Sequence, residues 1–134
     1  MTHVRLPVGY WAFDVSGGEP FIQGQLPYVQ KALDWARVVG LKVIIDLHGA
    51  PGSQNGFDNS GQLKRSGPEW HLNPTNVERT NAIVKTLAET FSGDSDVVAA
   101  IAPLNEQVFQ FFWGQYRAKY PIDPLVSLEK PFST

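Results

Sequence analysis

Residues 43–61 read VIIDLHGAPGSQNGFDNSG and join a short apolar run to a long polar loop. The run is β-branched and of strand length, which is typical of a parallel strand covered on both faces. The loop carries Ser, Gln, Asn and Asp, with Phe57 as its one large apolar residue. Because a loop that only connects two elements can be much shorter, the stretch predicts a strand whose end enters a functional loop.

Two helical patterns and two more strand-like runs flank this stretch. The expected elements are a strand over 3–8, a helix over 27–39, a strand over 42–47, a helix over 75–91 and a strand over 97–104. This alternation predicts an α/β fold of two consecutive βαβ units, with parallel strands and right-handed crossovers. Three such strands cannot close a barrel and leave both sheet edges bare, so the pattern indicates part of a domain.

Local signals mark the ends of the helices. Gly40 stops the first helix, and Thr75 and Glu78 form a capping-box pattern at the start of the second. Trp35 lies within the first helix and is expected to be a packing residue.

Composition excludes several classes of function. The chain has 134 residues, a net charge of −2 and a pI near 5.8, so no basic surface indicates nucleic acid or anionic lipid as a partner. It has no Cys and its three His are not spaced as metal ligands, so neither a metal nor a cofactor is expected. No apolar run approaches the roughly 20 residues that span a bilayer, and the first residues lack the pattern of a signal peptide.

Candidate catalytic residues follow the predicted strands. In a parallel sheet the chemistry gathers at the carboxyl ends of the strands, and both His48 and the pair Asn105–Glu106 fall there. Glu106 directly follows an apolar run, and a partly dry setting would suit a general acid. Glu106 could instead cap the next helix or face solvent, and His48 could be a structural histidine rather than a substrate contact.

Two further positions leave alternatives open. Arg5 on an apolar strand needs a carboxylate partner if its head group is buried, and it could pair with Glu106 or another acid or reach solvent. Phe57 with Asp58 and Asn59 combines an apolar plate with hydrogen-bonding groups, which suits a sugar ring. The alternative, favoured by the Asn-Gly and Asp-Asn-Ser-Gly sequences alone, is an ordinary turn in which Phe57 is tucked back as an anchor.

Four segments together resemble a family of carbohydrate enzymes. They are HVRLPVGYWAF at 3–13, PYVQKALDWA at 27–36, VIIDLHGAPGSQNGFDNSG at 43–61 and IAPLNE at 101–106. The chain is similar over these segments to the fungal exo-β-1,3-glucanases of glycoside hydrolase family five. The stretch DLHGAPGSQNG is long and specific, whereas a lone Asn-Glu pair would not be.

The resemblance implies roles for individual residues. Glu106 would be the acid/base, and Asn105 would contact the sugar 2-hydroxyl. The other matched positions would form the polar shell of a glucose subsite, with Arg5 and His48, and the cleft entrance, with Phe57 and Asp58.

The resemblance also implies an architecture and a setting. The family fold is a (β/α)8 barrel, a TIM barrel, of which this chain would be an incomplete piece holding about strands two to four with their helices. The implied activity is exo-acting, retaining hydrolysis of a β-glucan polysaccharide by a monomer, secreted or in the cell wall, with no nucleic acid or membrane partner.

The chain departs from the family pattern after Glu106. Gln107 stands where the family has Pro, and a loop is missing, which predicts a deletion or a splicing difference. The chain then divides into a partial barrel over 1–106 and a divergent aromatic helix with an irregular tail over 107–134. The family nucleophile lies on a later strand, and a retaining glycosidase needs two carboxyl groups about 5–5.5 Å apart. Little or no hydrolysis is therefore expected, with a glucan-binding remnant or a mis-predicted gene product as alternatives.

Overall fold

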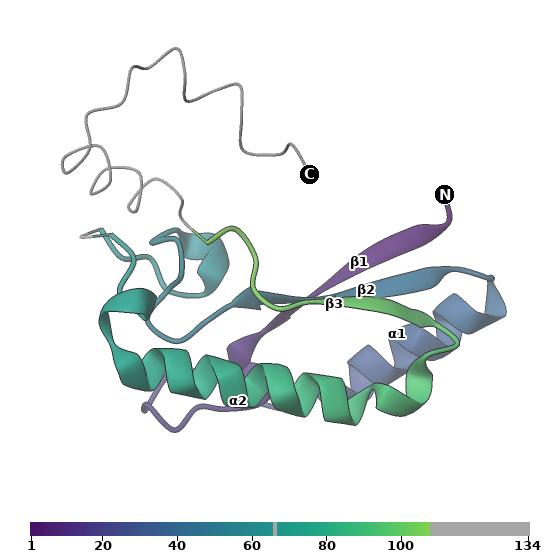
Figure 1. Ribbon diagram of the computed structural model, residues 1–134, viewed down its shortest axis with the longest axis horizontal. Helices are drawn as coiled ribbons and strands as arrows, with labels where there is room; N and C mark the ends of the chain where they lie inside the picture. Colours follow the sequence, from purple (N-terminus) through teal and green to yellow (C-terminus); the bar gives the residue numbers. More distant parts are fainter. Residues whose placement is uncertain (66, 108–134) are drawn as a thin grey trace, which may run out of the picture.

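The computed structural model describes residues 1–65 and 67–107, which form a three-stranded sheet and two helices (Figure 1). The strands are β1 (His3–Gly9), β2 (Lys42–Gly49) and β3 (Val98–Ala102), and the helices are α1 (Leu26–Val38) and α2 (Pro74–Thr90). Short 3-10 turns lie between them: η1 (Tyr10–Ala12), η2 (Asp58–Ser60), η3 (Trp70–Leu72) and η4 (Ser92–Asp94). The strand order is β1-β2-β3 and both pairs are parallel, which confirms the two predicted βαβ units.

The strand ends differ from the predicted ones in ways that matter for the site. β2 continues through Gly49, so His48 lies within the strand rather than after it. β3 ends at Ala102, and Pro103 lies beyond the ladder, where its missing N–H costs no strand hydrogen bond. The aromatic helix and tail predicted over 107–134 fall outside the described residues, apart from Gln107.

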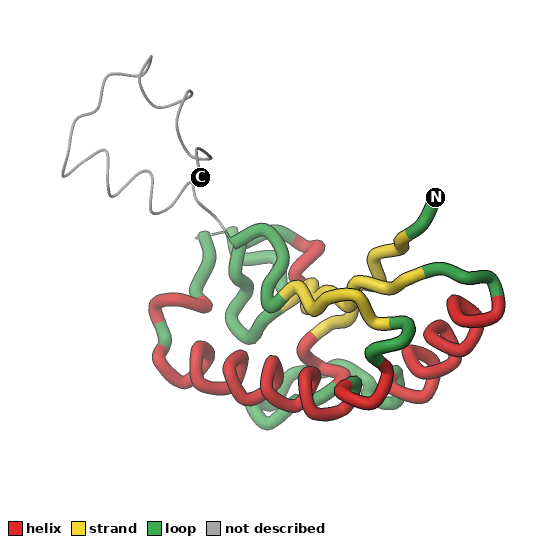
Figure 2. The backbone as a smooth tube through the Cα atoms, turned by 45° about the vertical axis from the view of Figure 1, so that its right-hand side comes forward, coloured by secondary structure: helices red, strands yellow, loops and turns green. Residues whose placement is uncertain are grey.

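Both helices lie on the same face of the sheet (Figures 1 and 2). Val43, Ile45 and Leu47 alternate along β2 and are buried against this layer, together with Leu33 of α1 and Leu87 of α2. In the order β1-β2-β3, successive right-handed crossovers return the chain on the same side of the sheet. The strand order therefore accounts for the one-sided helix layer.

No helix among the described residues covers the opposite face of the sheet. Arg5 and Pro7 on β1 are exposed on that face, as is Ala100 on β3. The prediction that β2 is covered on both faces is thus wrong for this part of the chain. The sequence of β2 is nevertheless as apolar as that of a strand covered on both faces. The reason is that β2 is the central strand, and its neighbours β1 and β3 screen Ile44 and Asp46 from solvent.

The start of α2 corrects the predicted capping box. The side chain of Asn73 accepts a hydrogen bond from the backbone N–H of Thr75 at 3.0 Å, and Pro74 follows at the first helical position. Asn is among the best N-cap residues, and Pro at this position loses no helical hydrogen bond. Thr75 is therefore the second residue of the helix and not its cap.

Trp35 corrects a second expectation, since its side chain is 65% exposed. The buried residues of α1 include Leu33, and a residue two positions further on is rotated by about 200° around the helix. Trp35 consequently points away from the core. Trp70 differs from Trp35, because its Nε1 donates to Oγ1 of Thr80 at 2.9 Å and so anchors the segment before α2 to this helix.

Arg79 of α2 fastens the loop after β1 to the helix layer. Its guanidinium donates to Oδ2 of Asp14 at 2.5 Å and to Oε1 of Glu19 at 2.8 Å. Burial is the largest single influence and raises the pKa of both carboxyl groups, but the hydrogen bonds from Arg79, further hydrogen bonds from backbone N–H groups and the Arg79 charge together outweigh it, so both pKa values lie below their ordinary range. Nearby, burial and then the Glu19 charge raise the pKa of Tyr10.

Candidate active site

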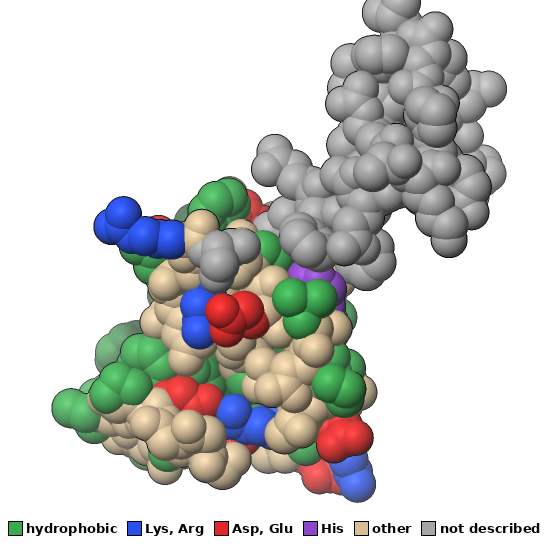
Figure 3. Space-filling model, turned by 90° about the vertical axis from the view of Figure 1, so that its left-hand side faces the viewer, with side chains coloured by type: hydrophobic (Ala, Val, Ile, Leu, Met, Phe, Trp, Pro, Cys, Tyr) green, Lys and Arg blue, Asp and Glu red, His purple; other side chains and the backbone are tan. Residues whose placement is uncertain are grey.

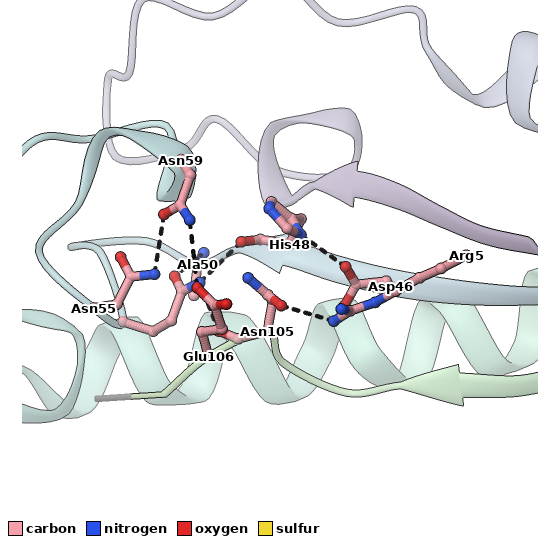
Figure 4. Close-up of polar contacts among 9 residues, drawn as sticks. Arg5, Asp46, His48, Ala50, Asn55, Asn59, Asn105 and Glu106 are labelled. Atoms are coloured by element: carbon pink, nitrogen blue, oxygen red, sulfur yellow. Dashed lines mark hydrogen bonds and ion pairs between the residues drawn. The ribbon is translucent and has the colours of Figure 1, made fainter. Parts of the chain in front are cut away.

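A buried carboxylate on β2 connects side chains from β1, from β2 and from the segment after β3. Asp46 is fully buried, and its Oδ1 accepts a hydrogen bond from Nη2 of Arg5 at 2.9 Å. Its Oδ2 lies 2.7 Å from Nδ1 of His48. The same Arg5 nitrogen donates to Oδ1 of Asn105 at 2.7 Å. Figure 4 shows these side chains as one continuous network, in which Asp46 rather than Glu106 is the acid that pairs with Arg5.

Asp46 also orients the imidazole of His48. A carboxylate only accepts hydrogen bonds, so the short contact assigns a proton to Nδ1 of His48. The side chain of His48 is 32% exposed. The ring is therefore fixed at one nitrogen while Nε2 is left for a ligand.

Asn105 is held from three sides. Its N–H donates to the carbonyl of Leu47 at 2.9 Å, its own carbonyl accepts from Nε2 of Gln54 at 2.9 Å, and its Oδ1 accepts from Arg5. The residue is 2% exposed, yet its Nδ2 has no hydrogen-bond partner in the described structure. An unsatisfied buried donor costs about 1–3 kcal/mol, so a ligand oxygen at this position would be stabilising.

The loop after β2 is folded by its own polar side chains. The hydroxyl groups of Ser53 and Ser60 share a hydrogen bond at 2.7 Å, and both residues are fully buried. Gly49 permits this close return, because a Cβ there would lie 2.3 Å from the carbonyl oxygen of Ser60. Gln54 and Asn55 are also buried. Many of the polar side chains that suggested a functional loop therefore form hydrogen bonds within the loop or with its ends.

Glu106 lies at the end of this network, in an exposed position. Its φ is +40°, and its Oε2 makes a long 3.5 Å contact with Nδ2 of Asn59, whose Oδ1 accepts from Asn55 at 3.0 Å. The partly dry setting predicted for Glu106 is not found among the described residues, because Glu106 and Gln107 are exposed although Asn105 before them is buried. Asn59 is the loop side chain that reaches Glu106 (Figure 4).

Phe57 and Asp58 occupy the exposed part of the same loop. The Phe57 side chain is 54% exposed, so the alternative that it is tucked back as an anchor is wrong. Asp58 begins η2 and is also exposed. Of the predicted site residues, Arg5, His48 and Asn105 thus share one network. Glu106 directly follows Asn105 and contacts Asn59 of the loop, and Phe57 and Asp58 precede Asn59.

Sequence reasoning missed two members of this network, Asp46 and Gln54. Asp46 could have been found, because it lies two residues before His48 and residues so spaced share a face of a strand. Gln54 could not, since its contacts depend on how the loop returns toward Asn105, and no local pattern encodes that return.

The surface carries charges of both signs. On the face in Figure 3, acidic side chains lie next to basic ones rather than forming a region of one sign. Residues 1–65 and 67–107 contain no group of three His, Cys, Asp or Glu placed to hold a metal ion. Within the same range, no helix is both long and apolar enough to cross a membrane.

Proteins of similar sequence are known from fungi. No family model matches it. A glucan 1,3-beta-glucosidase from Blumeria graminis is 47% identical over 131 residues, covering 89% of this chain. A probable glucan 1,3-beta-glucosidase A from Neosartorya fischeri is 56% identical over 107 residues, covering 79%. The chain is homologous to the fungal glucan 1,3-beta-glucosidases. This confirms the resemblance seen in residues 1–106.

The homology covers a minor part of these glucan 1,3-beta-glucosidases. The chain spans 30% of the Blumeria graminis protein and 25% of the Neosartorya fischeri protein. Among solved structures, a rutinosidase from Aspergillus niger superposes with a TM-score of 0.69 at 19% identity, over 80% of this chain and 30% of that one. AoRut gives the same TM-score at 24% identity, over 79% of this chain and 30% of that one. At such identities the likeness concerns the α/β fold.

Proposed function

We propose that this chain forms the acid/base side of a glycoside hydrolase site for β-1,3-glucan. One observation carries the proposal: Asn105 and Glu106 adjoin the Arg5–Asp46–His48 network at the carboxyl edge of the sheet. The relatives that share this stretch are named glucan 1,3-beta-glucosidases. Carboxyl, amide and imidazole groups at such an edge suit general acid/base chemistry on a sugar.

The three strands would be consecutive strands of a (β/α)8 barrel. The one-sided helix layer supports this, because a barrel places every helix outside the sheet and leaves the inner face free of helices. Arg5, Pro7 and Ala100 would then face the barrel interior. Neighbouring barrel strands would cover both sheet edges and the open face.

Each polar group has a separate part in the proposed reaction. The Glu106 carboxyl protonates the leaving glycosidic oxygen and then, as a carboxylate, removes a proton from the attacking water. Nδ2 of Asn105, which has no partner among residues 1–65 and 67–107, donates to a sugar hydroxyl. His48 and Arg5 contact further hydroxyls, and Asp46 holds both of them in place.

Phe57 and Asp58 form the rim of the proposed glucan site. The exposed ring of Phe57 offers an apolar plate for the C–H face of a glucose unit, and aromatic contacts of this kind favour sugar rings. The Asp58 carboxylate beside it accepts hydrogen bonds from hydroxyls.

A retaining, exo-acting mechanism needs a second carboxylate about 5–5.5 Å from the first. The other carboxylate in the described network, Asp46, is fully buried and already engaged by Arg5 and His48, so it is unsuited to attack an anomeric carbon. We infer that the nucleophile belongs to a part of the barrel other than these strands. The 134-residue chain should then bind β-1,3-glucan and hydrolyse it little.

A paired assay tests the proposal. The purified 134-residue chain and its Glu106→Gln variant are incubated with insoluble β-1,3-glucan, and retention on the polysaccharide and glucose release are measured separately. Retention of both proteins without release is expected. Robust release that disappears in the Glu106→Gln variant would refute the inferred lack of a nucleophile, and failure of the folded chain to be retained would refute glucan binding.

Secretion or attachment to the cell wall is proposed on the family resemblance alone. Immunodetection of the protein in the culture medium and the wall fraction of cells that express it would support it, and detection only inside the cells would contradict it.

A further inference from the structure

Gln54 makes three backbone hydrogen bonds beside the proposed acid/base. Its side chain is buried, with 2% of the residue exposed. Its Oε1 accepts from the N–H of Ala50 at 3.0 Å, and its Nε2 donates to the carbonyl oxygens of His48 and Asn105, each at 2.9 Å. Every hydrogen-bonding atom of the carboxamide is therefore engaged by the backbone.

These bonds connect two strand ends that are distant in sequence. His48 and Ala50 belong to the end of β2 and the loop that follows, whereas Asn105 follows β3. The N–H of Asn105 is bound to the carbonyl of Leu47, and the carbonyl of Asn105 accepts from Gln54. The peptide groups on both sides of the Asn105 Cα are therefore each held by one hydrogen bond, and Gln54 makes the one on the peptide that leads into Glu106. The loop end and the segment carrying Glu106 cannot shift independently while these bonds persist.

Glu106 needs such support because its backbone is strained. Its φ of +40° lies in the left-handed region, which residues other than glycine rarely adopt. Strained conformations of this kind persist only where the surroundings over-determine them. The Gln54 carboxamide is the side-chain group that binds the carbonyl immediately before this residue.

We propose that Gln54 is a positioning residue for Glu106. It holds the Asn105–Glu106 peptide so that one ligand can contact both the Glu106 carboxyl and Nδ2 of Asn105, which no described residue binds. The acid/base role of Glu106 rests on the proposed function, whereas the positioning of its backbone does not.

Two substitutions separate hydrogen bonding from packing. Gln54→Met keeps a similar volume but removes all three hydrogen bonds. Gln54→Glu places a carboxyl between two carbonyl oxygens, and burial among acceptors raises the pKa of such a group. Below that pKa the carboxylic acid donates to one carbonyl, and above it the carboxylate repels both. Gln62→Met is the matched control, since Nε2 of Gln62 donates to the Tyr10 hydroxyl elsewhere in the same loop.

Backbone amide NMR of the 134-residue chain between about pH 5 and pH 9 measures the effect. The Glu106 amide reports the hydrogen bond on the preceding carbonyl. In Gln54→Met it should shift at every pH, and in Gln54→Glu it should shift as the pH rises, while core amides such as Ile45 stay in place. The ionisable side chains near Gln54 are His48, Asp46, Glu106 and Arg5, so each spectrum is compared with the wild-type chain at the same pH.

Binding of a β-1,3-linked glucose trisaccharide is measured on the same samples. Loss of buried hydrogen bonds of this kind weakens binding by about tenfold, so Gln54→Met and high-pH Gln54→Glu should bind about tenfold more weakly, and Gln62→Met as wild type. If Gln54→Met fails to fold, Gln54→Glu at pH 5 and pH 9 carries the comparison.

The outcomes distinguish this inference from the proposed function. A Glu106 amide that stays in place in both Gln54 variants overturns the positioning role, whatever the binding result. Selective movement of that amide, in a chain whose wild type does not bind the trisaccharide, supports the positioning role and counts against the glucan site.

Discussion

A carboxylate buried beneath an arginine and a histidine is stable only while both partners remain, because an unpaired buried charge is strongly disfavoured. Asp46 is in this situation, and through Arg5 it also fixes Asn105. One side chain thereby orients groups from β1, from β2 and from the segment after β3, none of which could be aligned by its own strand alone.

Asp46→Asn tests this dependence. The variant amide can still accept from Arg5, but it lacks the charge and the second acceptor that face His48. We expect trisaccharide binding, measured by calorimetry, to weaken by about tenfold. The free energy of unfolding, measured by urea titration, should fall by about 1–3 kcal/mol. Asp34→Asn is the control, because Asp34 makes an exposed pair with Arg37 on α1. Unchanged binding in Asp46→Asn would show that His48 and Arg5 are oriented without it.

Phe57→Ala separates binding from stability. The ring is 54% exposed, so its removal should change the free energy of unfolding by less than about 0.5 kcal/mol. Loss of a stacking surface should still reduce glucan retention by about tenfold. Leu63 is 58% exposed and lies later in the same segment, so Leu63→Ala should leave retention intact. Equal losses in both variants would indicate a nonspecific apolar effect.

At the scale of elements, the contact between α2 and the loop after β1 depends on charge. Arg79 is 14% exposed and binds Glu19, which is 8% exposed, together with Asp14. Hydrogen bonds that favour the charged form of a carboxyl lower its pKa, and this links folding to pH.

Arg79→Met should destabilise the chain by about 1–3 kcal/mol at pH 7, between the values for exposed and buried pairs. The lowered pKa values of Asp14 and Glu19 contribute stability above their ordinary values of 3.8 and 4.5, and this contribution is lost as pH falls through the lowered values. The difference between wild type and variant in urea unfolding should therefore shrink below about pH 4. Lys85→Met, at an exposed pair, is the control. A difference that persists at pH 2 would contradict the linkage.

At the scale of the molecule, β2 is the one described strand with a neighbour on each side. The outer edges of β1 and β3 carry backbone groups without strand partners among the described residues, and local opening is easiest where such protection is least. Hydrogen exchange of the 134-residue chain should be slowest in β2. Equally slow exchange in β1 and β3 would show that another segment or a second copy covers the edges.

Local patterns were sufficient for the order of the elements. Two βαβ units were predicted from the helical periodicity of apolar residues in α1 and α2 and from the β-branched run of β2. The positions of His48 and Asn105–Glu106 near strand ends were enough to predict that they lie at one edge of the sheet. The alternation of side chains along a strand could also have indicated Asp46, because residues two positions apart share a face and Asp46 lies two residues before His48. Trp35 was misjudged although helix periodicity places it outside.

The sequence by itself therefore determined the α/β order and the edge at which the polar residues gather, because hydrophobic period and strand length are local properties. Long-range packing determined that Arg5 pairs with Asp46, that Gln54 reaches Asn105, that both helices cover one face, and that Phe57 is exposed. These features depend on strand register, on the handedness of the crossovers and on the return of a loop. They arise only when residues as far apart as Arg5 and Asn105 are brought within hydrogen-bond distance.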